Sequence, residues 1–454
     1  MQLKAKFMVN EHKMPAAMQK VTSFRCNNLA GDISPPGDKS ISHRSIMLGG
    51  ISSGTTTVRG LLEGEDVLHT VAALSAMGAK IHKHENVWMV TGVGSAGLQP
   101  PTSTLDMGNS GTSARLLMGL VAGKNFTTRC TGDASLCKRP MGRVIEPLSK
   151  MGATFESTDG KLPLSVTGAA QPIAITYALP VASAQVKSAI LLAGLSADGI
   201  TRVIEAIPTR DHSENMLRGF GAKVEITKDE NGADVIAITG KPKLTAQNIT
   251  VPADPSSAAF PLVAALLCPG SRVTLRNVGL NPRRAGLIET LIEMGANITF
   301  ENRRSEGGEP VADLVVLGSE LKGIDVPASR APSMIDEYPV LSAAAACATG
   351  TTRMRGLGEL RVKESDRLAL IAQGLAQCGV RVEVEGDDLI VHGTGKAPQG
   401  GATIATAMDH RIAMSFLVLG TRTTDPISID DGSFIATSFP GFVGMMNGLG
   451  ASIR

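Results

Sequence analysis

A short ending that recurs six times along this 454-residue chain constrains its fold more than any other feature. Three copies have the form Leu-x-x-Met-Gly-Ala and three are close variants. They occupy residues 74–81, 148–155, 217–224, 291–298, 375–382 and 446–453. Glycine at this place ends a helix, because it adopts the left-handed conformation that a helix C-terminus needs, and the residues after it predict a strand. The copies lie about 70 to 85 residues apart, so each closes a supersecondary unit larger than a solenoid repeat.

Each unit also opens in a similar way. A polar cluster precedes an apolar helix of small residues, as in Asn-Ser-Gly-Thr at 109–112 and Asp-His-Arg at 409–411. The unit is predicted to run loop, buried helix, strand, loop, amphipathic helix, strand. Six units predict an α/β protein with two domains of three units, because a chain of this length is too long for one ordinary core.

Proline-containing segments mark the predicted domain boundaries. Pro35-Pro36-Gly37 and Val251-Pro252-Ala253-Asp254 each break a strand just before a new helix start. The predicted domains are residues 38–252 and residues 21–37 plus 253–454. If the first strand after residue 20 pairs with the C-terminal half, the chain crosses twice between the domains. Two crossings make a natural hinge, and a site in the cleft between the domains would close on its ligand.

Composition excludes several classes of function. The chain has 44 basic and 42 acidic residues, a net charge of +2 and only 3% aromatic residues, so neither general polyanion binding nor base stacking is expected, and no nucleic-acid partner. The six cysteines show no C-x-x-C spacing and the histidines no H-x-x-x-H spacing, which predicts a reducing compartment and no metal. No apolar run reaches the length of a membrane span, and residues 1–20 lack a signal-peptide pattern. We therefore expect a cytoplasmic protein with no membrane partner. Residues 1–20 are expected to be a flexible extension, or an upstream start without structural meaning.

The densest cluster of chemistry follows the first boundary, in Gly37-Asp38-Lys39-Ser40-Ile41-Ser42-His43-Arg44-Ser45. Asp38 or Ser40 is a candidate N-cap, and Ser40 and Arg44 then share a helix face at i, i+4 with Lys39 at its mouth. Free amides, the positive end of the helix dipole and two cations make an anion site. A solvated basic helix start explains this stretch alone equally well, but the pattern recurs.

If the six units point their helix N-termini the same way, the polar starts converge on one cleft. The cations of that cleft would be Lys39, Arg44, Arg139, Arg210, Lys363, Arg367 and Arg411. The neutral donors would be Ser40, Thr112, Ser183 and Gln185, and the acids Asp336 and Glu364 with Asp66 or Asp409. So many cations exceed the need of one phosphate and suit two anionic substrates bound together. Taken alone, residues 361–368 favour a surface helix with internal salt bridges, and residues 409–411 an N-capped helix with a partly exposed histidine.

Together these motifs resemble the 5-enolpyruvylshikimate-3-phosphate synthase family. The resemblance rests on residues 37–44, 109–112, 138–142 (Lys-Arg-Pro-Met-Gly), 361–367 and 409–411, and runs in the right order from about residue 22 to the C-terminus. It is closest to the subgroup that includes glyphosate-tolerant bacterial enzymes. The resemblance implies a two-domain inverse α/β barrel (the enolpyruvyl transferase fold) of six βαβαββ repeats, three per domain. It also implies a monomer without cofactor that transfers the enolpyruvyl group of phosphoenolpyruvate to the 5-hydroxyl of shikimate 3-phosphate and releases phosphate.

The resemblance also implies roles for individual residues. Shikimate 3-phosphate would be bound by Lys39, Ser40, Arg44, Ser183, Ala184, Gln185, Arg210, Asp336 and Lys363. Phosphoenolpyruvate would be bound by Lys39, Gly111, Arg139, Gln185, Arg367 and Arg411. The catalytic groups would be Asp336 as base on the 5-hydroxyl, Glu364 for proton transfer at C3, and Lys39 as proton donor to the departing phosphate.

Three positions depart from the family pattern. Ala184 stands where many members have serine, so one hydroxyl contact is missing, and Thr437 replaces a lysine of another subgroup. Gly111 stands where the tolerant enzymes carry alanine, whose methyl group crowds the inhibitor. We therefore expect glyphosate to compete with phosphoenolpyruvate in this protein.

Two other functions compete with this interpretation. The sister enolpyruvyl transferase acting on UDP-N-acetylglucosamine usually has a cysteine five residues before the loop Arg-Pro. Here Ala134 holds that place, and Cys137 is at the wrong offset. A non-catalytic anion-binding scaffold would explain the cations, but not the acids Asp336 and Glu364 placed among them.

Overall fold

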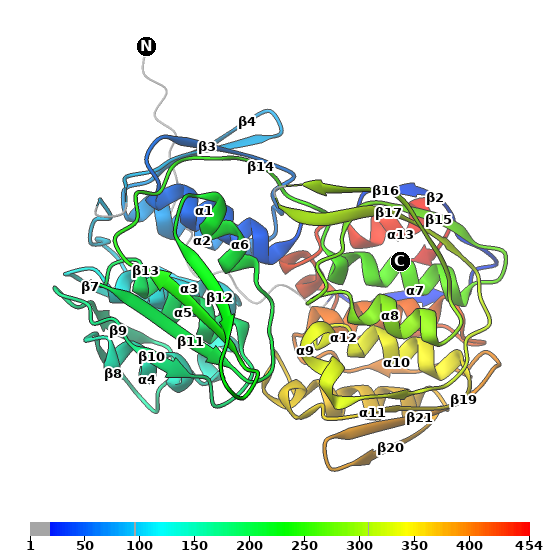
Figure 1. Cartoon of the computed structure of the whole chain (residues 1–454). Coiled ribbons are helices and arrows are strands. Elements are labelled where there is room, and N and C mark those ends of the chain that lie inside the picture. The colour runs from blue at the N-terminus through cyan, green and yellow to red at the C-terminus, as the bar shows by residue number, and fades with distance from the viewer. Residues whose placement is uncertain (1–18, 95–96, 307) are drawn as a thin grey trace.

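The computed structural model describes residues 19–94, 97–306 and 308–454, which form two lobes (Figure 1). The first eighteen residues of the predicted flexible extension lie outside this description. One lobe surrounds a hydrophobic core drawn from residues 41–251. The other surrounds a core drawn from residues 258–453, to which Val21 and Leu29 are added from the start of the chain.

Within the described residues, six four-stranded sheets, three in each lobe, surround these cores. In the first lobe they are β14 (Asn248–Thr250), β3 (Thr55–Arg59), β5 (Val87–Thr91), β4 (Lys80–His84); β6 (Leu105–Asp106), β7 (Thr127–Thr131), β9 (Leu164–Thr167), β8 (Thr154–Ser157); and β10 (Thr176–Ala178), β11 (Ile200–Glu205), β13 (Asp234–Thr239), β12 (Val224–Lys228). In the second lobe they are β2 (Ala30–Ile33), β15 (Arg272–Gly279), β17 (Glu309–Leu317), β16 (Asn297–Glu306); β18 (Asp325–Val326), β19 (Thr349–Met354), β21 (Asp388–Thr394), β20 (Arg381–Glu385); and β22 (Thr403–Ile404), β23 (Ile427–Ile429), β1 (Val21–Phe24), β24 (Ser452–Ile453). Every sheet has the same pattern: the first pair of strands is parallel and the next two pairs are antiparallel. The chain is thus the predicted α/β protein of six βαβαββ units, three per lobe.

Two helices belong to each unit. The buried helices are α1 (Lys39–Ile51), α3 (Gly111–Ala122), α5 (Ala184–Gly194), α7 (Pro255–Leu267), α10 (Tyr338–Cys347) and α12 (His410–Gly420). The outer helices are α2 (Glu65–Ala76), α4 (Gly142–Lys150), α6 (His212–Gly219), α8 (Gly286–Glu293), α11 (Arg367–Gln377) and α13 (Phe442–Gly448). Short turns complete the set: α9 (Ala331–Met334), η1 (Leu136–Lys138), η2 (Ala328–Arg330), η3 (Gly358–Val362) and η4 (Ser433–Thr437). Small residues let the buried helices approach closely: a Cβ on Gly119 of α3 would lie 2.3 Å from the Ala189 carbonyl oxygen of α5.

The six recurrent endings all form the predicted helix stop. Their glycines have φ between 78° and 106°, in the left-handed region. The residue after each glycine donates its N–H to the carbonyl of the first residue of the repeat, as from Ala79 to Leu74 (3.1 Å) and from Ala222 to Leu217 (2.9 Å). This is the hydrogen bond of a Schellman motif, which releases the chain directly into the next strand.

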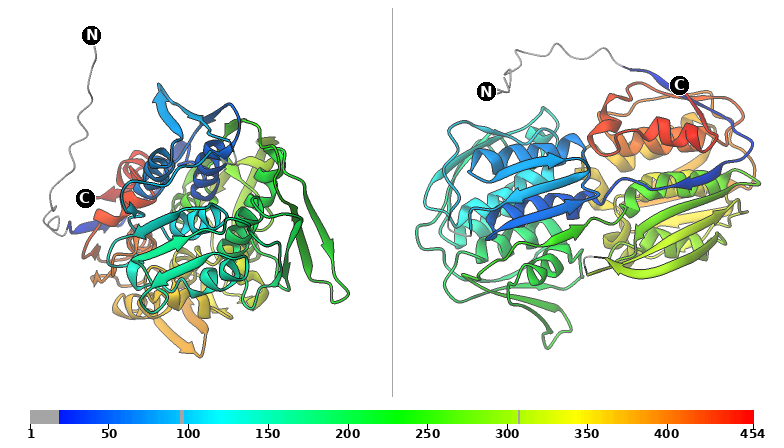
Figure 2. Two further views of the ribbon diagram at one scale, coloured as in Figure 1. Left: turned by 90° about the vertical axis from the view of Figure 1, so that its left-hand side faces the viewer. Right: turned by 90° about the horizontal axis from the view of Figure 1, so that it is seen from above.

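The start of the chain completes two sheets of the second lobe. β1 pairs antiparallel with β23 and β24, and β2 pairs parallel with β15. Figure 2 shows this N-terminal stretch, dark blue, beside the red C-terminal helix. The chain therefore passes into the first lobe after β2 and returns after β14.

Asp313, on β17, leads to a prediction about acid stability. Burial by itself raises the pKa of Asp313. The hydrogen bonds from the Asn277 N–H and the Asn302 side chain and the charge of Arg276 outweigh this effect and lower the pKa to about 2. Because the folded pKa lies below the unfolded value of 3.8, this stabilisation is complete above about pH 4 and is lost as the pH falls towards 2. We expect Asp313→Asn to lower the free energy of unfolding by about 2 kcal/mol at pH 7 and by almost nothing near pH 2.

Urea unfolding of wild type and Asp313→Asn between pH 7 and pH 2 measures this difference. Asp32→Asn is the matched control, since Asp32 also pairs with Arg276 but is exposed, and it should change the free energy by about 0.5 kcal/mol or less. A gap between wild type and Asp313→Asn that stays constant with pH would contradict the assignment.

Candidate active site

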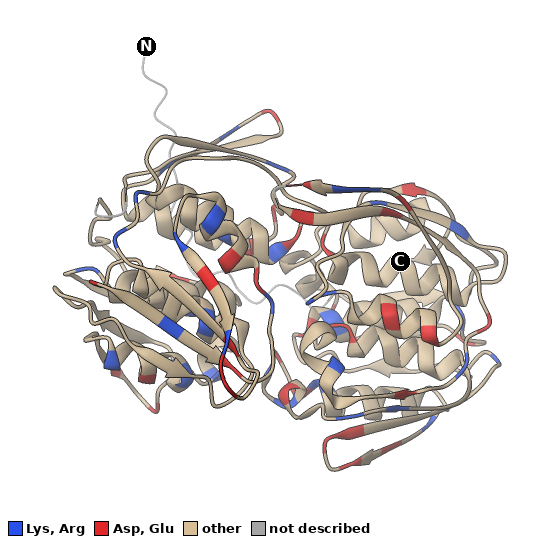
Figure 3. Cartoon of the chain, viewed as in Figure 1, with Lys and Arg blue, Asp and Glu red and all other residues tan. Residues whose placement is uncertain are grey.

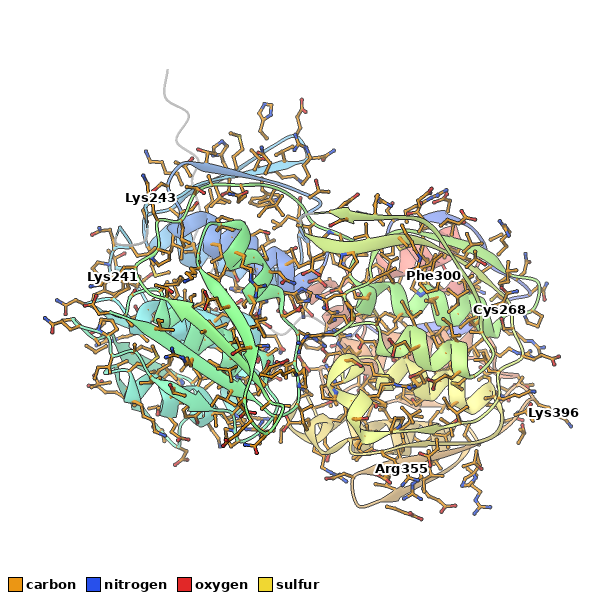
Figure 4. The ribbon with its side chains drawn as sticks, in the orientation of Figure 1. Lys241, Lys243, Cys268, Phe300, Arg355 and Lys396 are labelled. Atoms are coloured by element: carbon orange, nitrogen blue, oxygen red, sulfur yellow. The ribbon has the colours of Figure 1, made fainter. Side chains whose placement is uncertain are left out.

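A cavity of about 580 Å³ lies between the two lobes and is lined by both. Its wall includes these predicted residues: Lys39, Ser40, Asp66, Gly111, Thr112, Arg139, Ser183, Ala184, Gln185, Arg210, Asp336, Lys363, Glu364 and Arg411. Figure 3 shows basic and acidic segments facing each other along the boundary between the lobes. By contrast, Lys241 and Lys243 lie on the outer side of the first lobe and Lys396 on that of the second (Figure 4).

The helix starts explain why these side chains meet. Asp38 caps α1 by accepting from the Ile41 N–H at 2.8 Å, Ser110 caps α3 from Ser113 (3.1 Å) and Ser183 caps α5 from Val186. These caps place Lys39, Gly111 and Ala184 in the first turns, at the positive end of each helix dipole. The first lobe therefore presents three helix N-termini to one cavity.

Arg44, Arg367 and Asp409 do not line the cavity but lie behind its wall. Arg44 is buried, and its guanidinium donates to Ser213 Oγ (2.7 Å), Ser188 Oγ (2.9 Å) and the Ser40 carbonyl (3.0 Å). Arg44 therefore holds the first turn of α1 against α5 and α6.

Arg367 is a hub for three carboxylates. Its side chain is fully buried, with Nη1 3.1 Å from Asp336 Oδ1 and Nε 2.7 Å from Asp409 Oδ2, and it also donates to Glu364. Burial alone raises the pKa of Glu364, but Arg367 and then Arg139 lower it well below its usual value. Arg367 thus keeps the cavity acids ionised and fixed in position.

Asp336 and Glu364 of the second lobe each pair with an arginine of the first. Arg210 Nη2 lies 2.6 Å from Asp336 Oδ2, and Arg139 Nη1 lies 3.6 Å from Glu364 Oε1. Burial raises the pKa of Asp336, but Arg411, Arg210 and Arg367 lower it well below its usual value. Two ionised carboxylates therefore stand among cations from both lobes.

Two lysines, Lys39 and Lys363, also line the cavity. Lys39 Nζ is 3.0 Å from Asp66 Oδ2 within the first lobe. Burial lowers the pKa of Lys363, and Asp336 counteracts part of this effect. An ammonium whose pKa is lowered in this way is a better proton donor than a solvated lysine.

The expectation of a partly exposed histidine at position 410 is wrong. Asp409 does cap α12, accepting from the Arg411 N–H at 2.9 Å, but His410 is buried, not partly exposed. Burial, followed by the charges of Lys39 and Arg411, lowers the pKa of His410 well below its usual value. Asp409 points its carboxylate to Arg367, and this tertiary contact draws the start of the helix inwards.

Several residues of the cavity wall were not predicted from the sequence. Arg115 donates to Gln185 Oε1 at 2.6 Å, and Gln185 Nε2 donates to Thr112 Oγ1 at 3.0 Å. Arg115 lies one helical turn after Gly111, so an i, i+4 search from that glycine would have found it. Arg143 and Glu359, on the cavity rim, join the lobes by an exposed pair at 3.1 Å that no sequence pattern announces.

Gly111 leaves space next to two guanidinium groups. A Cβ added there would lie 3.0 Å from Arg115 Nη1 and 3.2 Å from Arg139 Nη1. Both atoms are ends of flexible side chains, so a methyl group is accommodated only if one or both cations shift. Residue 111 therefore controls how closely an anion can approach this part of the wall.

In the part of the chain that the structure describes, no group of three or more His, Cys, Asp or Glu side chains is arranged to hold a metal ion. No helix in residues 19–94, 97–306 and 308–454 has the length and apolarity needed to cross a bilayer.

Comparison with known proteins yields consistent matches along nearly the whole chain. Residues 25–446 match the family model described as EPSP synthase (3-phosphoshikimate 1-carboxyvinyltransferase). The 3-phosphoshikimate 1-carboxyvinyltransferase of Paramagnetospirillum magneticum is 62% identical over 435 residues, covering 95% of this chain and 98% of that protein. Its namesake from Rhodospirillum rubrum is 59% identical over 445 residues, covering 97% and 99%. A solved structure of EPSP synthase from Acinetobacter baumannii has a TM-score of 0.85 at 48% identity, covering 96% of this chain and 99% of that one.

Proposed function

Because the chain belongs to the EPSP synthase family, we propose that it transfers the enolpyruvyl group of phosphoenolpyruvate to the 5-hydroxyl of shikimate 3-phosphate, releasing phosphate. This is a step of the shikimate pathway, which leads to aromatic amino acids. The observation that carries the proposal is the pair of ionised carboxylates, Asp336 and Glu364, held among arginines from both lobes in one cavity. A scaffold that only bound anions would gain nothing from acids at these places.

In this proposal the two substrates occupy different parts of the cavity. Shikimate 3-phosphate lies against Ser183, Gln185 and Arg210, near Asp336 and Lys363, and phosphoenolpyruvate lies against Gly111, Arg139 and Arg411. Lys39 contacts both. All of these residues line one cavity, which supports binding of both substrates together, and two anions need this many cations to offset their mutual repulsion. We infer that Arg44 and Arg367, which lie behind the wall, act by positioning Ser40 and the carboxylates.

Asp336 is the proposed base on the 5-hydroxyl. In the free protein three arginines hold its pKa well below the usual carboxylate value, which makes it a weak base. Substrate phosphate and carboxylate groups would neutralise part of that positive charge, so the pKa of Asp336 would rise towards the range of a working base. Base strength is in this way coupled to occupation of the site by both substrates.

Glu364 is the proposed group for proton transfer at C3 of phosphoenolpyruvate. Glu364 is ionised in the free protein, so it must first take up a proton, which becomes favourable when the anionic substrates offset the charges of Arg367 and Arg139. As the 5-oxygen attacks C2, Glu364 gives this proton to C3 and a tetrahedral intermediate forms. The same carboxylate then removes a proton from C3 while the C2–O bond to phosphate breaks. Lys39, whose ammonium lies on the cavity wall, donates a proton to the leaving phosphate oxygen, and the arginines stabilise the charge that develops.

The UDP-N-acetylglucosamine transferase is not favoured as an alternative. The position of its usual cysteine is occupied by Ala134, and the similar proteins carry the name 3-phosphoshikimate 1-carboxyvinyltransferase at 57–62% identity. A phosphate-release assay with phosphoenolpyruvate tests the choice directly. Release that depends on shikimate 3-phosphate supports the proposal, and release that depends on UDP-N-acetylglucosamine overturns it.

We further propose that the lobes act as two domains, residues 38–252 and residues 21–37 plus 253–454, that close over the substrates. Arg210–Asp336 and Arg139–Glu364 support this, because each pair joins the two lobes next to the reacting centre. We also propose that the enzyme works in the cytoplasm as a monomer, in keeping with small anionic substrates that both fit one chain's cavity.

Glyphosate is expected to compete with phosphoenolpyruvate, and Gly111→Ala to weaken that inhibition by tenfold or more. The added methyl group would push against Arg115 Nη1 and Arg139 Nη1, at 3.0 and 3.2 Å, and narrow the phosphoenolpyruvate side of the cavity. Inhibition titrations at fixed substrate, with the KM for phosphoenolpyruvate determined separately, measure the effect. Gly444→Ala, where a Cβ meets nothing within 4 Å, is the control and should match wild type. Equal glyphosate tolerance of wild type and Gly111→Ala would refute the role of this glycine.

A further inference from the structure

The two connections between the lobes form a single hydrogen-bonded strap. Asp38 N–H donates to the Pro252 carbonyl and Asp254 N–H to the Pro36 carbonyl, both at 2.8 Å. The strap is tightly packed, since a Cβ on Gly37 would lie only 1.9 Å from the Gly60 carbonyl oxygen. The outgoing and returning segments therefore move together, not as two independent linkers.

Each connection ends in an aspartate that caps a buried helix. Asp38 accepts from Ile41 N–H at the start of α1, and Asp254 accepts from Ser256 N–H at the start of α7, both at 2.8 Å. Asp254 also accepts from the N–H of Lys39 at 3.1 Å. The first turn of α1, in one lobe, is thus tied to the helix cap of the other.

Arg284 joins these two aspartates. It lies in the loop between β15 and α8, and its side chain is 2% exposed. Nη1 lies 2.9 Å from Asp38 Oδ2, and Nη2 lies 2.9 Å from Asp254 Oδ1 and 2.7 Å from Ser256 Oγ. Burial raises the pKa of Asp38, but Arg284, followed by other nearby cations, brings it below its usual value. One planar guanidinium therefore fixes both helix caps at once, which a lysine ammonium cannot do with the same geometry.

The same contacts lead to the cavity from both sides. Lys39 and Ser40, directly after Asp38, line it from the first lobe. On the other side, Ser256 donates to the buried Glu337, whose Oε1 lies 3.8 Å from Arg411 Nη1. Glu337 follows Asp336 in the chain, so one network connects Arg284 with the residues proposed to act on both substrates.

We propose that Arg284 is a positioning residue: it pins the crossing point of the lobes, so that Lys39 and Ser40 of one lobe and Asp336 and Arg411 of the other meet at the distance the reaction needs. The proposal rests on the proposed function of the cavity. Misplacing reacting groups by about 1 Å costs on the order of 100-fold in rate. Loss of the Arg284 contacts should therefore lower the turnover rate even when the protein still folds.

Three variants test this role, with phosphate release as the assay and thermal unfolding as the check on folding. Arg284→Lys keeps the positive charge but loses the planar guanidinium that donates to both aspartates. Arg284→Met loses the charge and the guanidinium. The triple variant adds Asp38→Asn and Asp254→Asn to Arg284→Met, which removes the buried charges while keeping side chains that can cap helices. For all three we expect kcat/KM to fall by tenfold or more, with the KM of both substrates raised. The melting temperature should drop for Arg284→Met and recover to within about 5 °C of wild type in the triple variant.

Arg276→Met is the matched control. Arg276 also joins two aspartates, Asp32 and Asp313, in the same lobe, but it does not line the cavity. Its loss should lower the melting temperature and leave kcat/KM within threefold of wild type.

Small-angle scattering adds a measurement, the radius of gyration, that a change in stability alone does not alter. With shikimate 3-phosphate and glyphosate present, wild type should contract and the folded Arg284 variants should contract less.

A folded Arg284→Lys or triple variant with kcat/KM within threefold of wild type would overturn the proposal. Loss of folding in all three variants would overturn it too, because Arg284 would then serve folding alone. If wild type itself releases no phosphate with shikimate 3-phosphate, the proposed function fails instead.

Discussion

Replacing Glu364 with glutamine should lower turnover by about 10²- to 10⁴-fold while both substrates still bind. The glutamine side chain would keep an oxygen to accept from Arg367 Nη2, so the buried arginine retains a partner, but it cannot exchange a proton with C3. The effect should appear in kcat, with the KM values changed only a few-fold, because the lost interaction is made in the transition state.

Two measurements check the role of Glu364. Phosphate release gives kcat and KM, and calorimetric titration with shikimate 3-phosphate gives binding. In deuterated water wild type should place deuterium on C3 through the reversible addition, and Glu364→Gln should lose this exchange together with turnover. Glu383→Gln, in a surface pair with Arg381, is the control and should behave as wild type. Unchanged turnover in Glu364→Gln would remove Glu364 from the mechanism.

Replacing Lys187 with methionine should destabilise the protein by about 3–5 kcal/mol. Lys187, on α5, is fully buried, and its Nζ lies 2.7 Å from both Glu205 Oε2 and Glu214 Oε1. Without the ammonium, two buried carboxylates would face each other unpaired, which costs more than the ion pairs themselves contribute. The loss should be seen as a lower midpoint of urea unfolding at unchanged slope.

A matched surface pair calibrates this effect. Lys150 and Glu146 form an i, i+4 pair at 2.8 Å with both side chains exposed, so Lys150→Met should cost about 0.5 kcal/mol or less. Adding Glu205→Gln and Glu214→Gln to Lys187→Met should recover most of the stability, because no buried charge then remains in this cluster. A loss below about 1 kcal/mol in Lys187→Met would show that the carboxylates find other partners or take up protons at little cost.

Much of the candidate site was predictable because its parts are local. A capping aspartate or serine, a following apolar helix and the residues between them are set by neighbours in sequence. Lys39, Gly111 and Ser183 were located from such patterns, and all three lie on the cavity wall. The residues that no pattern singled out, such as Arg143 and Arg284, owe their positions to partners more than two hundred residues away.

The six units, their helix stops and the clustering of polar helix starts can be read from the amino-acid order, because each depends on contacts within a few residues. The strand partners of β1, β2 and β14, which complete sheets far from their neighbours in the chain, follow from the packing of the whole molecule. The same packing sets which cations face the cavity and which lie behind it. Burial and long-range ion pairing are set by how the lobes pack, and a residue's type and local spacing do not contain that information.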